Sequence, residues 1–344
     1  MRRTYSLLLA ASLTAVFCQI PAAHALTLHA PDWVKPALRY VVSEGYFSPT
    51  DFHANDPMTR RSFKRLMERS FGGGYRRTRG TVTAGEVGGS LVRALGFKDL
   101  ASSLSSVTSP DGWDPELGKR FGTEVVSREL GLRHDRPTDE EMHEASASEP
   151  ITQGDAIWAV WKAKTAPDEY AAEALSSFSL ANYGAARRKV VKFALSLVGT
   201  PYIYGGEWLA KTPVGYPYGP QSVGGVDCSG FAWYVLQAKS SSYSPAGRHY
   251  QGWSIAERSA ADMAKAAPKR LKFGDLKPAD LVFFAEGGRD AHARDVYHTG
   301  IYLGGGWMIH SSGSRDGISL ANIGAGSWWR DQIFGGRRIV TNRD

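Results

Sequence analysis

Hydrophobic positions divide the chain into a helical first part and a mixed second part. Apolar residues recur at helical spacing in five segments, 32–44, 59–71, 84–95, 121–130 and 151–161, and most of these end at glycine. Later segments have strand character instead: 278–284, 297–303 and 307–311, the last two separated by three glycines in a hairpin pattern. The pattern predicts a mostly helical domain followed by an α+β domain.

The glycine hairpin predicts which side chains share a face of the sheet. Antiparallel partners keep a constant index sum, so a loop centred on Gly304 places His298 directly opposite His310. One face then carries His298, Gly300, Tyr302, Met308 and His310, and the other carries Ile301, Leu303, Trp307 and Ile309. The second set is wholly apolar and therefore faces the core, which leaves both histidines together on the opposite face.

A reactive thiol is expected at Cys228. It follows a glycine-rich segment and precedes an amphipathic stretch, 231–239, so it lies in the first turn of a predicted helix. Unpaired backbone N–H groups and the helix dipole favour a thiolate at that position. The chain has only one other cysteine, Cys18, and no internal disulfide remains once Cys18 is removed with a signal segment.

Residues 1–25 have the features of a signal peptide. Two arginines precede a short apolar run, and Ala23-His24-Ala25 forms a small-x-small cleavage site, which predicts a mature start at Leu26. No other stretch approaches the length of a transmembrane helix. We therefore expect a secreted protein, located in the cell wall or periplasm.

Charge is unevenly distributed along the chain. The formal net charge is +7, and the C-terminal half is basic whereas the helical half is slightly acidic. A basic exported domain suits an anionic envelope polymer through long-range attraction. Nucleic acid is not expected, because the chain is exported and has no helix rich in lysine and arginine.

Cys228, His298 and His310 supply the parts of a nucleophilic site. A thiol nucleophile needs a base within hydrogen-bond reach, and the base needs an orienting group. We assign Cys228 as nucleophile, His298 as base and later general acid, and His310 as the group that orients His298. Two other interpretations stay open on the residues alone: a zinc site built from the same three side chains, and a pair of structural core histidines.

The second half resembles the NlpC family of bacterial cell-wall cysteine peptidases. The motifs PYIYGG, GVDCSGF, PADLVFF and HTGIYLGGGWMIHSS follow one another in the family's order, across about 186–344. The resemblance implies a papain-like α+β domain, with the nucleophile helix packed on an antiparallel sheet and no cofactor or metal. It also implies that Tyr202 stabilises the oxyanion, and that Asp227 and Ser229 contact the substrate or, for Asp227, support the site.

Peptidoglycan is the substrate that this resemblance implies, with cleavage between D-γ-glutamyl and a diamino acid of the stem peptide. The same three residues could also serve an amidase that cuts the sugar–peptide link or an acyl transferase. A non-enzymatic wall-binding protein is a further alternative. The segment 207–225 is longer than the usual family spacer and is a candidate specificity loop or lid.

The helical half resembles S-layer homology modules, which anchor exported proteins to wall polymers. Asp32-Trp33, Gly45-Tyr46-Phe47 and the segment 58–63 carry the resemblance, and the plan of a loop followed by a threonine-capped helix recurs. The resemblance implies binding of an anionic wall polymer, although only Arg60 follows a capping threonine as in those modules. The predicted divisions are 1–25, 26–165, a linker at 166–185, and a catalytic domain at 186–344.

Overall fold

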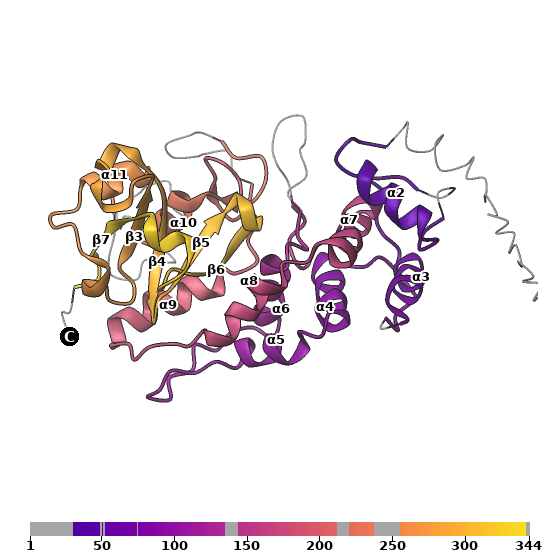
Figure 1. Cartoon of the computed structure of the whole chain (residues 1–344), viewed down its shortest axis with the longest axis horizontal. Helices are drawn as coiled ribbons and strands as arrows, with labels where there is room; N and C mark the ends of the chain where they lie inside the picture. Colours follow the sequence, from indigo (N-terminus) through magenta and orange to yellow (C-terminus); the bar gives the residue numbers. More distant parts are fainter. Residues whose placement is uncertain are drawn as a thin grey trace, which may run out of the picture.

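The structure is a computed structural model, and it describes residues 30–48, 50, 52–73, 75–134, 144–211, 220–236 and 255–341. Its described part is α+β: helices occupy one end of the long axis and an antiparallel sheet the other (Figure 1). The expected fold class is therefore confirmed. The predicted signal peptide and its cleavage site lie outside the described residues, as do residues 237–239 of the helix predicted to follow Cys228.

The first half contains a series of short helices. They are α2 (Lys35–Ser43), α3 (Arg60–Phe71), α4 (Ala84–Ala94), α5 (Lys98–Ser105), α6 (Phe121–Glu129) and α7 (Gln153–Thr165). Thr59, Thr83 and Thr152 cap α3, α4 and α7, each accepting a hydrogen bond from a backbone N–H of the first turn. The Glu86 carboxylate also accepts a hydrogen bond from the backbone N–H of Thr83, which completes a capping box.

The residues that precede these three threonines form a closed ring. Met58 N donates to Ile151 O at 2.9 Å, Val82 N donates to Met58 O at 2.9 Å, and Ile151 N donates to Val82 O at 3.0 Å. All three side chains are buried. The recurring loop and threonine-capped helix in the sequence thus correspond to three segments that are joined to one another by backbone hydrogen bonds.

The second half is built on a five-stranded antiparallel sheet with the strand order β6-β5-β4-β3-β7. The strands are β3 (Leu281–Ala285), β4 (Val296–Gly304), β5 (Trp307–Ser312), β6 (Gly317–Asn322) and β7 (Ile333–Arg337). α10 (Cys228–Val235) packs against β4 and β5, and α11 (Ala260–Lys265) packs against β4 and β7. A small ladder of β1 (Glu207–Trp208) and β2 (Gly225–Val226) precedes α10. The expected helix on an antiparallel sheet is therefore observed.

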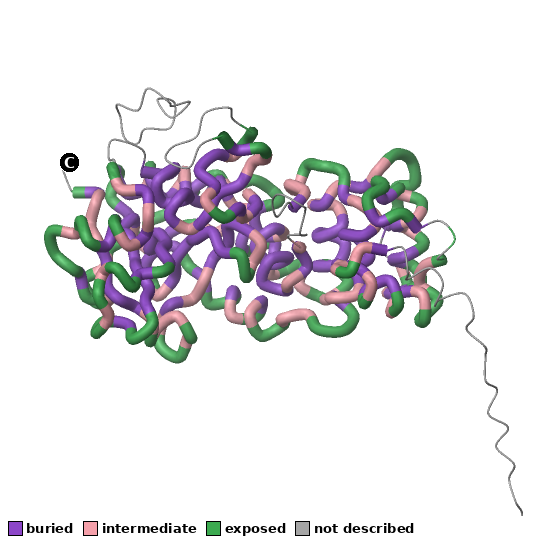
Figure 2. The backbone as a smooth tube through the Cα atoms, turned by 90° about the horizontal axis from the view of Figure 1, so that it is seen from above, coloured by how far each residue is buried: buried purple, intermediate pink, exposed green. Residues whose placement is uncertain are grey.

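The helical half and the sheet half share a core. One cluster of buried apolar side chains includes members of both, and buried stretches of backbone occur in both halves (Figure 2). α6 lies at the junction and is buried along nearly its whole length, with β6 on one side and α4 and α5 on the other. The segment predicted as a linker contains α8 (Glu169–Ala174), which also packs on α6. α9 (Ala185–Ser196) follows and packs on α10.

Among the helices of the described residues, none has the length and apolar character needed to cross a membrane.

Candidate active site

Cys228 is the first residue of α10, as the sequence predicts. Asp227 is the N-cap, and its Oδ1 accepts a hydrogen bond from the backbone N–H of Gly230. Gly230 is required here by close packing, because a Cβ at this position would lie 2.0 Å from Gly206 O. The backbone of the loop before β1 therefore lies directly against the start of α10.

A buried arginine holds this arrangement together. Arg258 Nε lies 2.9 Å from Glu207 Oε1, and Arg258 Nη1 lies 3.1 Å from Asp227 Oδ1. The same guanidinium donates to Ser229 Oγ and to the carbonyl oxygen of Gly206. Its two acidic partners are nearly inaccessible to solvent, so the ion pairs are shielded from water. The sequence pattern did not single out Arg258 or Glu207.

The environment of the thiol differs from the one expected. Cys228 is half-buried, and desolvation raises the pKa of the thiol to about 12, with the negative charge of Asp227 as the second cause. The backbone N–H groups of Thr299 and Ser229 oppose this by stabilising the thiolate. The helix start thus acts in the expected direction but is outweighed by burial, and the free protein holds a neutral thiol.

His298 and His310 lie on the same face of the hairpin and form a hydrogen bond. His298 Nε2 lies 2.7 Å from His310 Nδ1, and both side chains are buried. Burial lowers the pKa of His298 to about 3 and holds the pKa of His310 well below its ordinary value, so both rings are neutral. With Nε2 of His298 bound to His310, Nδ1 is the ring nitrogen left to accept a proton.

The predicted register of the hairpin was wrong, whereas the predicted faces are confirmed. Ile301 pairs with Ile309 and Tyr302 with Met308, and a bulge next to Gly304 absorbs one residue at the turn. By the same register Gly300, not His298, stands opposite His310. The shift is two residues and therefore preserves the face of every side chain.

The absence of a side chain at Gly300 allows the rings of His298 and His310 to meet although the two residues are not directly opposite each other. A Cβ at Gly300 would lie 3.1 Å from His310 Cβ and 2.9 Å from Met308 Sδ. Because Gly300 has no side chain, the space opposite His310 stays open and the two imidazoles approach each other. Trp329 covers the pair: its ring stacks on His298 with centroids 5.0 Å apart and meets His310 edge-on at 5.3 Å.

The thiol and the histidine pair are neighbours through the backbone of β4. Thr299, whose N–H contacts the thiol, directly follows His298 in the strand. Within the described residues no hydrogen bond joins the thiol to His298 itself, a geometry that often tightens only when substrate binds. The described residues also contain no cluster of three or more histidine, cysteine or acidic side chains placed to hold a metal ion.

The remaining predicted residues surround this site. Tyr202 is half-buried, and its ring lies 3.5 Å from where a Cβ on Gly313, just beyond β5, would be. Asp227 and Ser229 are both buried and make internal contacts with the helix start and Arg258. In the long segment 207–225, residues 212–219 lie outside the described residues, and the ends of the segment form β1 and β2.

A thiol at the start of a helix that packs on an antiparallel sheet, with a buried histidine pair on the adjacent strands, is the architecture of a papain-like α+β domain. Residues 199–338 match the model of the NlpC/P60 family, which confirms the resemblance that the sequence motifs indicated. The match covers the helix, the hairpin and all six predicted site residues.

Two curated relatives are similar to part of this chain. The chain is 32% identical over 135 residues to the gamma-D-glutamyl-L-lysine dipeptidyl-peptidase of Bacillus subtilis, covering 39% of this chain and 35% of the relative. It is 29% identical over 151 residues to the probable peptidoglycan endopeptidase LytE of the same organism, covering 44% of this chain and 34% of the relative. The chain thus spans about a third of the length of these relatives.

Among solved structures, the peptidoglycan hydrolase RipB from Mycobacterium tuberculosis is 25% identical with a TM-score of 0.33, covering 45% of this chain and 65% of that one.

Proposed function

We propose that the protein is a cysteine peptidase that hydrolyses a peptide bond in the stem peptides of peptidoglycan. The observation that carries the proposal is the 2.7 Å hydrogen bond between two buried neutral histidines, one residue away from the N–H that contacts the thiol. The name of LytE supports peptidoglycan as the substrate class, and the name of the other Bacillus subtilis relative supports a γ-D-glutamyl bond as the one cleaved. We propose that the enzyme cleaves the bond that follows D-γ-glutamate.

In the proposed reaction, His298 Nδ1 takes the thiol proton as Cys228 Sγ attacks the scissile carbonyl carbon. Because burial lowers the pKa of His298 to about 3, the base stays unprotonated in mildly acidic and neutral solution. The proton moves as the sulfur attacks, since the resting thiol is neutral. His310 then stabilises the imidazolium by accepting the hydrogen bond from Nε2.

Collapse of the tetrahedral intermediate breaks the C–N bond, and the leaving amine takes the proton from His298. The product is a thioester on Cys228. Water, deprotonated by His298, attacks the thioester and releases a carboxylic acid and the free thiol. We assign Tyr202 and the N–H groups at the start of α10 to stabilise the oxyanion, and Asp227 and Ser229 to position the helix start and the substrate end next to it.

The test is incubation of wild type and Cys228→Ala with purified peptidoglycan, followed by mass analysis of the released fragments. The expected result is a new free amine on the diamino acid with the wild type only. A freed muramyl lactyl group would indicate an amidase, and a transferred acyl chain an acyl transferase. Identical fragments from both proteins, or none, would leave a wall-binding role.

We further propose that the helical half binds an anionic wall polymer outside the cytoplasm. A surface cavity of about 510 Å³ is lined by Arg76, Arg77, Arg93 and Arg120, all exposed. The one acid among its lining residues, Glu86, is already paired with Arg60 and Arg77. Arg60, which the S-layer resemblance singled out, is thus held by Glu86, as is Arg77, and Arg76, Arg93 and Arg120 offer the positive charge instead.

Cosedimentation with cell walls before and after removal of the anionic polymer tests this proposal. The Arg76→Gln/Arg93→Gln/Arg120→Gln variant should lose the binding that depends on the polymer, and added salt should weaken binding of the wild type. Arg294→Gln, which removes an exposed arginine from the sheet half, is the control. Equal binding to stripped and native walls would contradict the proposal.

A further inference from the structure

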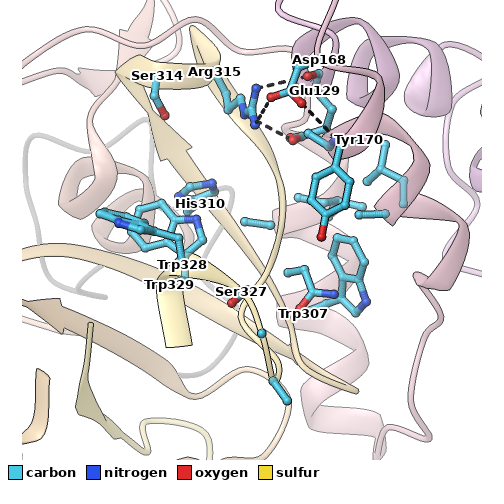
Figure 3. A pocket seen from close by; sticks show the side chains of 18 residues that line it. Glu129, Asp168, Tyr170, Trp307, His310, Ser314, Arg315, Ser327, Trp328 and Trp329 are labelled. Atoms are coloured by element: carbon cyan, nitrogen blue, oxygen red, sulfur yellow. Dashed lines mark hydrogen bonds and ion pairs between the residues drawn. The ribbon is translucent and has the colours of Figure 1, made fainter. Parts of the chain in front are cut away.

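A cavity of about 770 Å³ lies beside the histidine pair and is shared by the two halves of the molecule. One wall comes from α8 and the end of α6, and the other comes from β5, β6 and the segment 325–329 (Figure 3). His310 lies at its inner side, and Trp329, which stacks on His298, lines the same wall. The cavity therefore adjoins the candidate catalytic residues and is incomplete without the helical half.

The polar end of the cavity is fixed in place by ion pairs between the halves. Arg315, just after β5, lies 3.3 Å from Glu129 Oε2 and 3.1 Å from Asp168 Oδ2 (Figure 3). Glu129 also accepts a hydrogen bond from Ser319 of β6 at 3.0 Å. One guanidinium faces two carboxylates here, so this end has no uncompensated cation to attract an anion. Its hydrogen-bonding groups suit an uncharged polar ligand.

The middle of the cavity is aromatic. Tyr170 lies on the wall formed by α8, and Trp307, Trp328 and Trp329 lie on the wall from the sheet half, the last two next to His310 (Figure 3). Tyr170 is 84% exposed and Trp328 is 65% exposed, and these are two of the four large hydrophobic side chains that are exposed in the described part of the chain. Two large rings left in water on opposite walls of one cavity indicate a surface that a ligand covers.

We propose that this cavity is a subsite for an amino-sugar ring of the glycan strand to which the stem peptide is attached. A pyranose ring has a face of C–H groups and a rim of hydroxyl and amide groups, which match aromatic walls with a polar end. The volume lies within the range of sites that enclose small ligands, roughly 300–1,000 Å³. The inference rests on the proposed function, because it takes peptidoglycan as the substrate.

The kinetic test compares two substrates that differ only in the sugar. One is a stem peptide, and the other is the same peptide attached to its disaccharide. For wild type we expect the KM of the saccharide-bearing substrate to be lower by about tenfold, the effect of one stacking contact. Tyr170→Ala and Trp328→Ala should raise that KM toward the value of the free peptide, with kcat and the free-peptide kinetics unchanged.

Ring-preserving variants separate stacking from general damage to the fold. Tyr170→Phe and Trp328→Phe keep an aromatic face at each position and should retain most of the preference for the saccharide-bearing substrate. Equal KM values for the two substrates in wild type would overturn the inference. So would alanine variants that impair both substrates equally.

A binding measurement keeps the inference independent of catalysis. Cys228→Ala is titrated with an oligomer of N-acetylglucosamine while tryptophan fluorescence is followed, and Cys228→Ala/Trp328→Ala is titrated in parallel. Saturable quenching in Cys228→Ala that is lost in Cys228→Ala/Trp328→Ala would support the subsite. This holds even if wild type cleaved neither peptide, and in that case only the proposed function fails. Absence of quenching together with normal cleavage of both substrates would reject the subsite alone.

Discussion

At the scale of single residues, the site depends on groups that are kept neutral by burial. The thiol of Cys228 has a pKa raised to about 12 and His298 has a pKa lowered to about 3, so neither is charged near pH 7. An ion pair between them would have to be desolvated in the free protein. In the proposed reaction the proton transfer therefore accompanies attack on the substrate.

This protonation state has a measurable consequence for alkylation of Cys228. Native protein should react with iodoacetamide more slowly at pH 7 than urea-unfolded protein, whose thiol has an ordinary pKa of about 8.5. The native rate should still be rising at pH 9, because the thiolate fraction increases with pH throughout this range. A native rate that is already constant below pH 7 would show a preformed thiolate and contradict this expectation.

Gly300 provides a test of how the histidine pair is assembled. Gly300→Ala places a Cβ 3.1 Å from His310 Cβ and 3.0 Å from Ile309 O, so His310 must move. We expect a loss of about 1–3 kcal/mol in the free energy of unfolding, together with a larger fall in kcat than in substrate affinity. Urea unfolding and steady-state kinetics measure the two effects. Gly274→Ala, where nothing lies within 4 Å of the new Cβ, should change neither.

At the scale of elements, the start of α10 is held by contacts from distant parts of the chain. Arg258 reaches Asp227 and Glu207 across 31 and 51 residues of sequence. The two carboxylates come from different elements, the N-cap of α10 and the strand β1. The guanidinium therefore fixes the position of the thiol relative to the loop that carries Tyr202.

Substitution of Arg258 should lower the free energy of unfolding. Arg258→Met leaves two buried carboxylates without a cation, and we expect a loss of about 3–5 kcal/mol in the free energy of unfolding at pH 7. Urea unfolding followed by circular dichroism measures this. Arg294→Met is the matched control, because the Arg294 side chain is 81% exposed and its ion pair with Asp295 should contribute at most about 0.5 kcal/mol. Equal effects of the two substitutions would show that the network around Arg258 does not stabilise the fold.

The sequence predicted those features of the elements that depend on short-range pattern. The threonine caps, the helix after Cys228 and the two faces of the hairpin all follow from residues within a few positions of one another. The register of the hairpin could not be predicted in this way, because it depends on a bulge that the three glycines permit but do not specify. Arg258 could not be found either, since its partners are brought to it only by the tertiary fold.

At the scale of the whole molecule, buried carboxylates couple the helical half to the sheet. Glu129 and Glu144 lie at this junction, and desolvation raises the pKa of each to about 7. Glu129 meets Arg315 and Ser319 of the sheet half, and Glu144 meets Arg128 of α6. The junction is thus sensitive to pH in a range where most carboxylates are not.

The pH dependence of stability tests this coupling. Between pH 4.5 and 7 the folded protein binds a proton at Glu129 that the unfolded chain releases, so wild type should lose stability as pH rises through this window. Glu129→Gln has no such proton, and its stability relative to wild type should increase by on the order of 3 kcal/mol from pH 4.5 to 7. Thermal unfolding across this range measures the difference. Glu116→Gln, which removes an exposed carboxylate far from this junction in sequence, is the control variant.

The contact between the halves was the least predictable feature of the molecule. Nothing in the pattern of α6 distinguishes a helix that packs on a second domain from one that packs only within its own. Its charged side chains Glu124, Arg128 and Glu129 are buried, although the sequence suggests a solvent-exposed face. Glu124 pairs with Arg133 nearby in sequence, whereas Glu129 is stabilised by Arg315 and Ser319 of the sheet half, far away in sequence.

The ring of Met58, Val82 and Ile151 also bears on the order in which the protein is completed during synthesis. Two of its members are made early, but the third follows only after α5 and α6. A nascent chain that ends at α6 therefore has an unclosed ring, with Met58 N and Val82 O lacking the partners that Ile151 supplies. Synthesis from the N-terminus thus allows this ring to close only after α6 is complete, while α7, α8 and α9 still have to be made before the segment that carries the thiol.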